Sequence, residues 1–222
     1  MKTKKPIDPF TVAEADAIIE HLYNTLTHSM QIYAAYFEFA FYTGMRPSEI
    51  AALRWDEVDK KKRLANVCRI VADYKIEERT KTRNERQVML NSRAMHAIAV
   101  AEQIAEQRAK QSRRKQGRSP YVFPPTKNFE FIQQSSVTDK HFQAALSELK
   151  IRARRQYNCR HTYATMCLMA GMNPAFITTQ LGHSVQMLLT TYARWINSST
   201  DWSELNKLEN TMRLTNVSNN AS

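Results

Sequence analysis

The sequence has few of the features that mark secreted, membrane-spanning or zinc-binding proteins. It has three cysteines, Cys68, Cys159 and Cys167, whose odd number and wide spacing fit neither a disulfide framework nor a zinc-ligand pattern. No apolar run approaches the roughly 18 residues that a membrane-spanning helix needs. The basic start, Met1–Pro6, is not followed by the apolar stretch of a signal peptide. These absences predict a cytoplasmic protein with reduced thiols and no membrane partner.

Acidic residues are also in deficit. The 222 residues include 21 Asp and Glu against 32 Lys and Arg, which gives a formal net charge of +11. Such an excess favours a polyanionic partner. A membrane-surface protein would carry its basic residues on an amphipathic helix rich in Trp and Phe, whereas here they are scattered through predicted strands, turns and loops. Hydrophobic residues make up 43% of the chain, an ordinary share for a globular protein.

The first third of the chain is predicted to be helical. Thr11-Val-Ala-Glu14 has the pattern of a capping box, which predicts a helix from there to about residue 23. A second helix is expected over residues 29–43 and should stop at Gly44, because glycine readily adopts the left-handed conformation that ends helices. Pro47 suits a first helical turn and predicts a short helix over residues 47–55.

The pattern then changes to short strands and returns to helix. Strands are expected at 64–71, 74–79 and 86–90, with a turn at 81–84. Helices are expected at 92–113, 137–149, 156–170, 174–181 and 185–196, and the basic stretch 111–119 is expected to be an exposed connection. The predicted fold class is mainly α with a small three-stranded antiparallel β-sheet (α+β), in one domain.

Three residues near the C-terminal end could act on a phosphodiester. Arg160 can hold a phosphate through two parallel hydrogen bonds, and His183 follows a glycine at a predicted helix junction. Tyr192 lies nine residues further on and could attack the phosphorus. A phenol has a reference pKa of about 10, so it needs a positive environment to react as phenolate. Tyr157 lies three residues before Arg160 and shares its helix face.

A second arginine lies far upstream. Arg46 lies just after one predicted helix and just before another, where a helix N-terminus favours a bound anion. Glu49, three residues later, is expected to hold the Arg46 side chain in place without contacting the anion itself.

These motifs together resemble the tyrosine recombinases, or phage-type integrases. The resemblance rests on Thr-Gly-Met-Arg-Pro-Ser-Glu at 43–49, Arg-His-Thr at 160–162, Leu-Gly-His at 181–183 and Tyr192, and it covers about residues 10–195. It implies the catalytic-domain fold of that family and a site-specific recombinase. In such an enzyme Arg46, Arg160 and His183 would hold the scissile phosphate while Tyr192 forms a 3′-phosphotyrosine. Tyr157 would help these three residues to bind the phosphate.

The resemblance assigns further roles. It makes Lys81, in the turn before the last strand, the general acid for the leaving 5′ oxygen, with Lys75 as the alternative. It requires neither a metal nor ATP, so no cofactor is expected. Tyr157 stands where the family most often has a histidine, which leaves the general base open. His161 is expected to support the site structurally rather than to act in catalysis.

The resemblance also predicts partners and domain limits. Double-stranded DNA is the expected substrate, with a homo-tetramer on DNA, a monomer without it, and accessory DNA-bending proteins. Residues 1–9 would lead in from an N-terminal DNA-binding domain, 10–196 would form the catalytic domain, and the tail 197–222 would contact a neighbouring protomer. The expected role is integration and excision of a mobile element or prophage. Two alternatives stay open, a DNA-binding protein of the same fold without catalysis and a type IB topoisomerase.

Overall fold

The computed structural model describes residues 7–78, 85–111, 118–127 and 129–195, together with positions 206 and 209. Over these residues the chain is mostly helical, in agreement with the predicted fold class. The α-helices are α1 (Val12–Thr25), α2 (Gln31–Thr43), α3 (Pro47–Ala52), α4 (Ser92–Gln111), α5 (Ser136–Glu148), α6 (Asn158–Met169), α7 (Pro174–Leu181) and α8 (Val185–Tyr192). Short 3₁₀ helices occur at η1 (His28–Met30), η2 (Trp55–Glu57) and η3 (Ala193–Trp195).

The helix ends follow the local sequence signals. The Thr11 side chain accepts a hydrogen bond from the Glu14 backbone at 3.1 Å, and the Glu14 carboxylate accepts one from the Thr11 backbone at 2.8 Å. This is the predicted capping box at the start of α1. Helix α2 ends at Gly44, which has a φ of 62°, and α3 begins with Pro47, as expected.

The strands form two small antiparallel sheets. One has the order β1 (Val58–Asp59), β2 (Leu64–Val67), β5 (Arg86–Met89), and the other pairs β3 (Arg69–Ala72) with β4 (Lys75–Glu78). The predicted strand over residues 64–71 is therefore divided at Cys68. Its first half pairs with β5, which is only four residues long. Its second half folds back onto β4 through Asp73 and Tyr74, both with positive φ, as a two-residue hairpin turn requires.

Helices α3 and α8 end earlier than the sequence predicts. Helix α3 ends at Ala52 instead of residue 55, because Leu53 and Arg54 are extended and Arg54 pairs with Tyr121 in an isolated β-bridge. Helix α8 ends at Tyr192, where η3 takes over. Tightening into 3₁₀ geometry is common near helix ends. The predicted turn 81–84, which contains Lys81, lies outside the described residues. So do the tail 197–222, apart from positions 206 and 209, and most of the basic connection 111–119.

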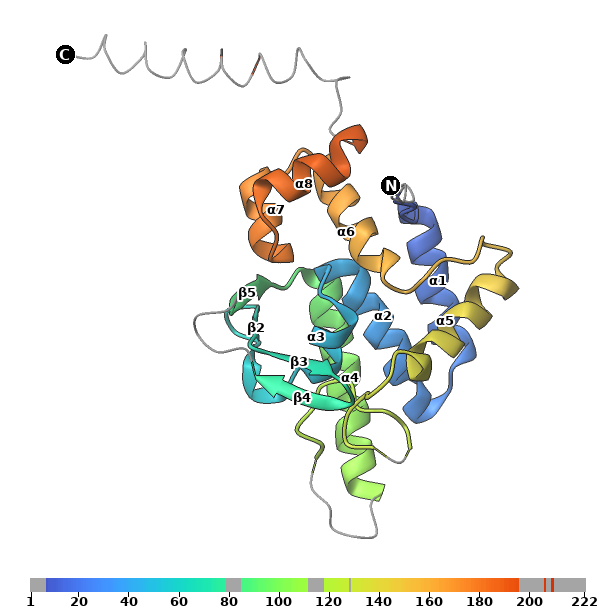
Figure 1. Cartoon of the computed structure of the whole chain (residues 1–222). Coiled ribbons are helices and arrows are strands. Elements are labelled where there is room, and N and C mark those ends of the chain that lie inside the picture. The colour runs from blue at the N-terminus through green and yellow to red at the C-terminus, as the bar shows by residue number, and fades with distance from the viewer. Residues whose placement is uncertain are drawn as a thin grey trace, which may run out of the picture.

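The hydrophobic core has a large and a small part. The large part centres on α2, whose aromatic side chains pack with α5, as in the stacked rings of Phe37 and Phe142 at 4.6 Å. The small part joins α6, α7 and α8 and contains Tyr192. Figure 1 shows these three helices, in orange, gathered at one end of the molecule with β5 beside α7. Among the described residues, no helix combines the length and the apolar character needed to cross a bilayer.

Candidate active site

Arg160 is the centre of the site and is 1% exposed. It lies in the first turn of α6, and its guanidinium reaches across to two other elements. Nη1 donates to the Gly44 carbonyl at 2.6 Å, and Nη2 donates to the Leu181 carbonyl and lies 2.8 Å from His183 Nε2. Arg160 therefore joins the C-terminal ends of α2 and α7. Burial, together with the charge of Arg46, lowers the pKa of Arg160 to about 10, so the group stays charged at neutral pH.

Gly44 allows this close approach of α2 to α6. A Cβ at this position would lie 2.5 Å from a ring carbon of Tyr163 and 2.8 Å from a methyl of Leu181. Its positive φ also disfavours other residues. The glycine thus sets the position of the carbonyl that Arg160 holds.

One buried carboxylate holds two more arginines. Glu49, 1% exposed, accepts from Arg46 Nη1 at 2.9 Å and from Arg86 Nη1 and Nη2 at 3.0 and 2.7 Å. Burial alone would raise the pKa of Glu49, but the hydrogen bonds and charges of Arg86 and Arg46 outweigh it and lower that pKa to about 2. Glu49 is therefore ionised and fixes both arginines.

Arg86 is a site residue that the sequence interpretation missed. It lies at the start of β5, and its Nε donates to the Gln180 carbonyl at 2.9 Å, which ties β5 to α7. The Gln180 side chain accepts from the Met89 backbone at 2.9 Å and strengthens the same junction. An arginine at a strand end carries no signal of this role, because its partner Glu49 lies 37 residues earlier in the chain.

His183 faces Arg160 through a fixed ring orientation. Gly182, with a φ of 63°, ends α7 and turns the chain so that the histidine lies beside the guanidinium. Burial, followed by the charges of Arg160, Arg46 and Arg86, lowers the pKa of His183 to about 4. Because Arg160 Nη2 can only donate, the neutral imidazole must accept at Nε2 and carry its proton on Nδ1.

Two donors of this site are left without a partner. Arg160 Nε and His183 Nδ1 are both buried, and neither has a hydrogen-bond partner among the described residues. Buried polar groups in folded proteins are nearly always paired, and a donor left unpaired costs about 1–3 kcal/mol. Both donors, surrounded by the positive charges of Arg46 and Arg86, suit an anion.

Tyr192 lies next to these groups but is 0% exposed. Its hydroxyl lies 2.7 Å from His161 Nδ1, and its ring packs against Trp195 with centroids 6.1 Å apart. Burial raises the pKa of Tyr192 to about 12, although the charge of Arg160 acts in the opposite direction. His161 thus contacts the Tyr192 hydroxyl directly, and the supporting role predicted for it from the sequence stays a prediction.

Two further predicted residues, Tyr157 and Lys75, are exposed. Tyr157 precedes α6 and is 39% exposed, with its ring edge against His161 at a centroid distance of 5.2 Å. Lys81 lies outside the described residues, so its role stays a prediction. Lys75, the alternative, is exposed at the start of β4 opposite Ala72. In the described part of the chain, no three His, Cys, Asp or Glu side chains gather as they would around a metal ion.

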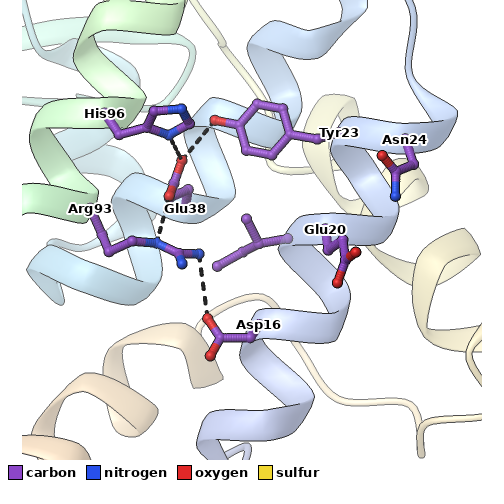
Figure 2. A pocket seen from close by; sticks show the side chains of 8 residues that line it. Asp16, Glu20, Tyr23, Asn24, Glu38, Arg93 and His96 are labelled. Atoms are coloured by element: carbon purple, nitrogen blue, oxygen red, sulfur yellow. Dashed lines mark hydrogen bonds and ion pairs between the residues drawn. The ribbon is translucent and has the colours of Figure 1, made fainter.

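A separate pocket lies between α1, α2 and α4. Figure 2 shows the side chains of Tyr23, His96 and Arg93 around Glu38. The Glu38 carboxylate lies 2.8 Å from the Tyr23 hydroxyl, 2.7 Å from His96 Nδ1 and 2.7 Å from Arg93 Nε. Arg93 also pairs with Asp16 at 3.3 Å. The central charges of this pocket, whose volume is about 470 Å³, are thus already paired with protein side chains. The cluster holds the three helices together and shares no lining residue with the Arg160 site.

The chain belongs to the phage integrase family, whose model matches residues 10–197. The prophage integrase IntR of Escherichia coli strain K12 is 32% identical over 209 residues, which cover 87% of this chain and 49% of IntR. The chain spans about half the length of the curated relatives it matches.

Solved structures share the fold at low sequence identity. The Tn1549 transposon integrase in complex with circular intermediate DNA has a TM-score of 0.70 at 18% identity, over 94% of this chain and 68% of that one. The XerA recombinase has a TM-score of 0.63 at 20% identity, over 96% of this chain and 66% of that one. The family resemblance and the fold class predicted from the sequence are both confirmed.

Proposed function

We propose that this chain carries the catalytic domain, residues 10–196, of a site-specific recombinase that cuts and rejoins double-stranded DNA. One observation carries the proposal. Arg160 Nε and His183 Nδ1 are buried donors without a partner among the described residues, and they lie in a positive site next to a buried tyrosine hydroxyl. A phosphodiester oxygen would satisfy both donors, and the net charge of +11 suits a DNA partner.

The proposed reaction combines this arrangement with the role that the family resemblance implies for Lys81. Arg46, Arg160 and His183 hold the non-bridging oxygens and stabilise the charge that develops on them. The Tyr192 oxygen attacks in line, the P–O5′ bond breaks, and the enzyme retains a 3′-phosphotyrosine. Lys81 gives a proton to the departing 5′ oxygen. The covalent bond conserves the energy of the phosphodiester, so a 5′-hydroxyl from another strand can reverse the step without ATP.

The wider biological role extends the same proposal. The enzyme would act in the bacterial cytoplasm on nucleoid DNA, as a homo-tetramer on its sites and a monomer elsewhere, with accessory DNA-bending proteins. The tail, residues 197–222, would contact a neighbouring protomer. The relatives described as a prophage integrase and a transposon integrase support integration and excision of a mobile element.

A covalent-trapping experiment tests the proposal. DNA duplexes are incubated with the chain at low salt. Each has a randomised core and a nick, placed so that cleavage releases the cut strand end. Adducts that survive SDS are recovered and sequenced, which also yields the DNA site. Tyr192→Phe should abolish the adduct, whereas Tyr163→Phe, at another buried tyrosine of the same small core, should form it.

The outcomes separate the alternatives. No adduct with the unaltered chain, or an adduct that persists in Tyr192→Phe, would refute the assignment of the nucleophile. Relaxation of supercoiled plasmid without strand exchange between two sites would instead favour a topoisomerase. Retention of DNA without any adduct would favour a binding protein that lacks catalysis.

A further inference from the structure

The phenol proton of Tyr192 needs an acceptor. Burial raises the pKa of Tyr192 to about 12, so at pH 7 only about one molecule in 10⁵ carries the phenolate. The residue at the position where the family most often has a histidine is Tyr157, whose phenol is a poor proton acceptor at neutral pH. The geometry of the site offers a different group.

His161 lies at hydrogen-bond distance from the atom that must lose the proton. Its Nδ1 is 2.7 Å from the Tyr192 hydroxyl, within the range expected of a general base. The next residue of α6, Thr162, accepts a buried hydrogen bond from the Phe10 backbone at 2.9 Å, which fixes this turn of the helix. Trp195 packs on the ring of Tyr192 and limits its movement. Both partners of the contact are therefore held in place.

Burial and a neighbouring positive charge keep the imidazole of His161 neutral. Burial, followed by the charge of Arg160 on the same helix, lowers the pKa of His161 to about 4. Tyr157 faces it from the start of α6, Tyr192 faces it from α8, and His183 lies close enough for their charges to interact. A neutral imidazole has the lone pair that a base needs. A phosphate bound at Arg160 would offset the positive charge there and raise the proton affinity of His161 when substrate is present.

We propose that His161 is the general base of strand cleavage and the general acid of rejoining. This inference rests on the proposed function. In cleavage the Tyr192 O–H proton moves to His161 Nδ1 as the oxygen–phosphorus bond forms, the P–O5′ bond breaks, and the 5′ oxygen takes its proton from Lys81. In rejoining, the 5′-hydroxyl gives its proton to Lys81 as it attacks the phosphorus, the bond between the phosphorus and the Tyr192 oxygen breaks, and His161 returns its proton to that oxygen. Each step conserves charge and protons.

Single-turnover cleavage of the duplex recovered in the trapping experiment tests the proposal, with the full chain as the enzyme. His161→Gln keeps a hydrogen-bonding group but cannot take up a proton, so the rate at pH 7 should fall about 100-fold. Its logarithm should then rise with pH with a slope of about 1 up to pH 9, as the phenolate population grows, whereas the unaltered chain stays flat. Tyr157→Phe should lose less rate than His161→Gln. The melting temperature of His161→Gln and its retention of DNA should match those of the unaltered chain.

A substrate with sulfur in place of the bridging 5′ oxygen separates the base from the acid. A thiolate leaves without protonation, so this substrate should restore cleavage to Lys81→Ala but not to His161→Gln. If His161→Gln is unfolded at the assay temperature, His161→Ala supplies the test, because added imidazole should raise its rate in proportion to the imidazole concentration.

Three results would overturn the inference. The first is a cleavage rate of His161→Gln within about threefold of that of the unaltered chain. The second is a loss of cleavage rate that is equal at every pH, as a packing defect alone would give. The third is restoration of His161→Gln cleavage by the sulfur substrate. An unaltered chain that forms no adduct would instead refute the proposed function. An adduct that depends on Tyr192 but not on His161 would refute only this inference.

Discussion

Replacing Glu49 with glutamine should destabilise the protein strongly, because one buried carboxylate holds two arginines. The Glu49 carboxylate accepts from Arg46 Nη1 at 2.9 Å and from both terminal nitrogens of Arg86. In Glu49→Gln one side of the amide becomes an NH₂ group, which cannot accept from a guanidinium. The substitution therefore leaves uncompensated positive charge inside the protein.

The magnitude follows from the pKa of Glu49. A fall from the ordinary 4.5 to about 2 corresponds to about 3 kcal/mol of preferential stabilisation of the ionised form. Removing one partner of a buried ion pair costs about 3–5 kcal/mol, which agrees. For a protein of this size such a loss lowers the melting temperature by about 6–12 °C. The matched control is Glu102→Gln, whose exposed pair with Lys60 at 2.8 Å should contribute less than about 1 kcal/mol.

The pH dependence provides a second readout of Glu49. Its pKa is lower in the folded than in the unfolded state, so its stabilising contribution is complete above about pH 4.5 and is lost as the pH falls toward 2. The difference in unfolding free energy between the unaltered chain and Glu49→Gln, from denaturant titrations, should therefore shrink over this range. A difference that is equal at pH 6 and pH 3, or a melting temperature within about 2 °C of the unaltered chain, would refute the reasoning.

Three further predictions concern the same end of the molecule. Gly44→Ala should lower the melting temperature, because a φ of 62° and a Cβ 2.5 Å from the Tyr163 ring together cost about 2–4 kcal/mol; a melting temperature equal to that of the unaltered chain would contradict this. The pKa values of His161 and His183 are about 4 in the folded protein, so between pH 6.5 and 4 the unfolded chain binds more protons and the free energy of unfolding should fall as the pH drops. In urea titrations, the variant with both His161→Gln and His183→Gln should lack this fall in the free energy of unfolding. Arg86→Lys keeps the charge but not the paired hydrogen bonds to the carboxylate, so it should cost about 2 kcal/mol in the same titrations, and a cost near zero would count against the role assigned to Arg86.

Local signals predicted most of the helices because they act within a few residues. The capping box of Thr11 and Glu14, the left-handed Gly44 and the N-terminal Pro47 each fix a helix end without help from the rest of the fold. The division of the strand run at Cys68 could not be predicted in this way. Both halves favour strand, and only the tertiary positions of β4 and β5 decide which half pairs with which.

For the active site, the motifs indicated which residues could act but not how they touch. The order of Arg46, Arg160, His183 and Tyr192 identified the family, which the family model then confirmed. The motifs gave no indication that Arg160 supports the fold by holding the ends of α2 and α7. Contacts between residues far apart in the chain, such as His161 with Tyr192, depend on how α6 and α8 pack. Arg46, Arg160, His183 and Tyr192 meet at one site, while the position of Lys81 stays a prediction.

The charges of the site explain why its reactivity should depend on DNA. Arg46 and Arg86 bond to the carboxylate of Glu49, whereas Arg160 bonds to backbone carbonyls, so these three guanidinium groups bring two more positive charges than the one carboxylate offsets. Without an anion, burial and the positive charge of Arg160 keep His161 unprotonated and a weak base. A bound phosphodiester would neutralise part of this charge and strengthen His161 as a proton acceptor beside the Tyr192 hydroxyl. The same anion that becomes the substrate would thus activate the nucleophile, and without DNA the phenol would stay protonated and buried.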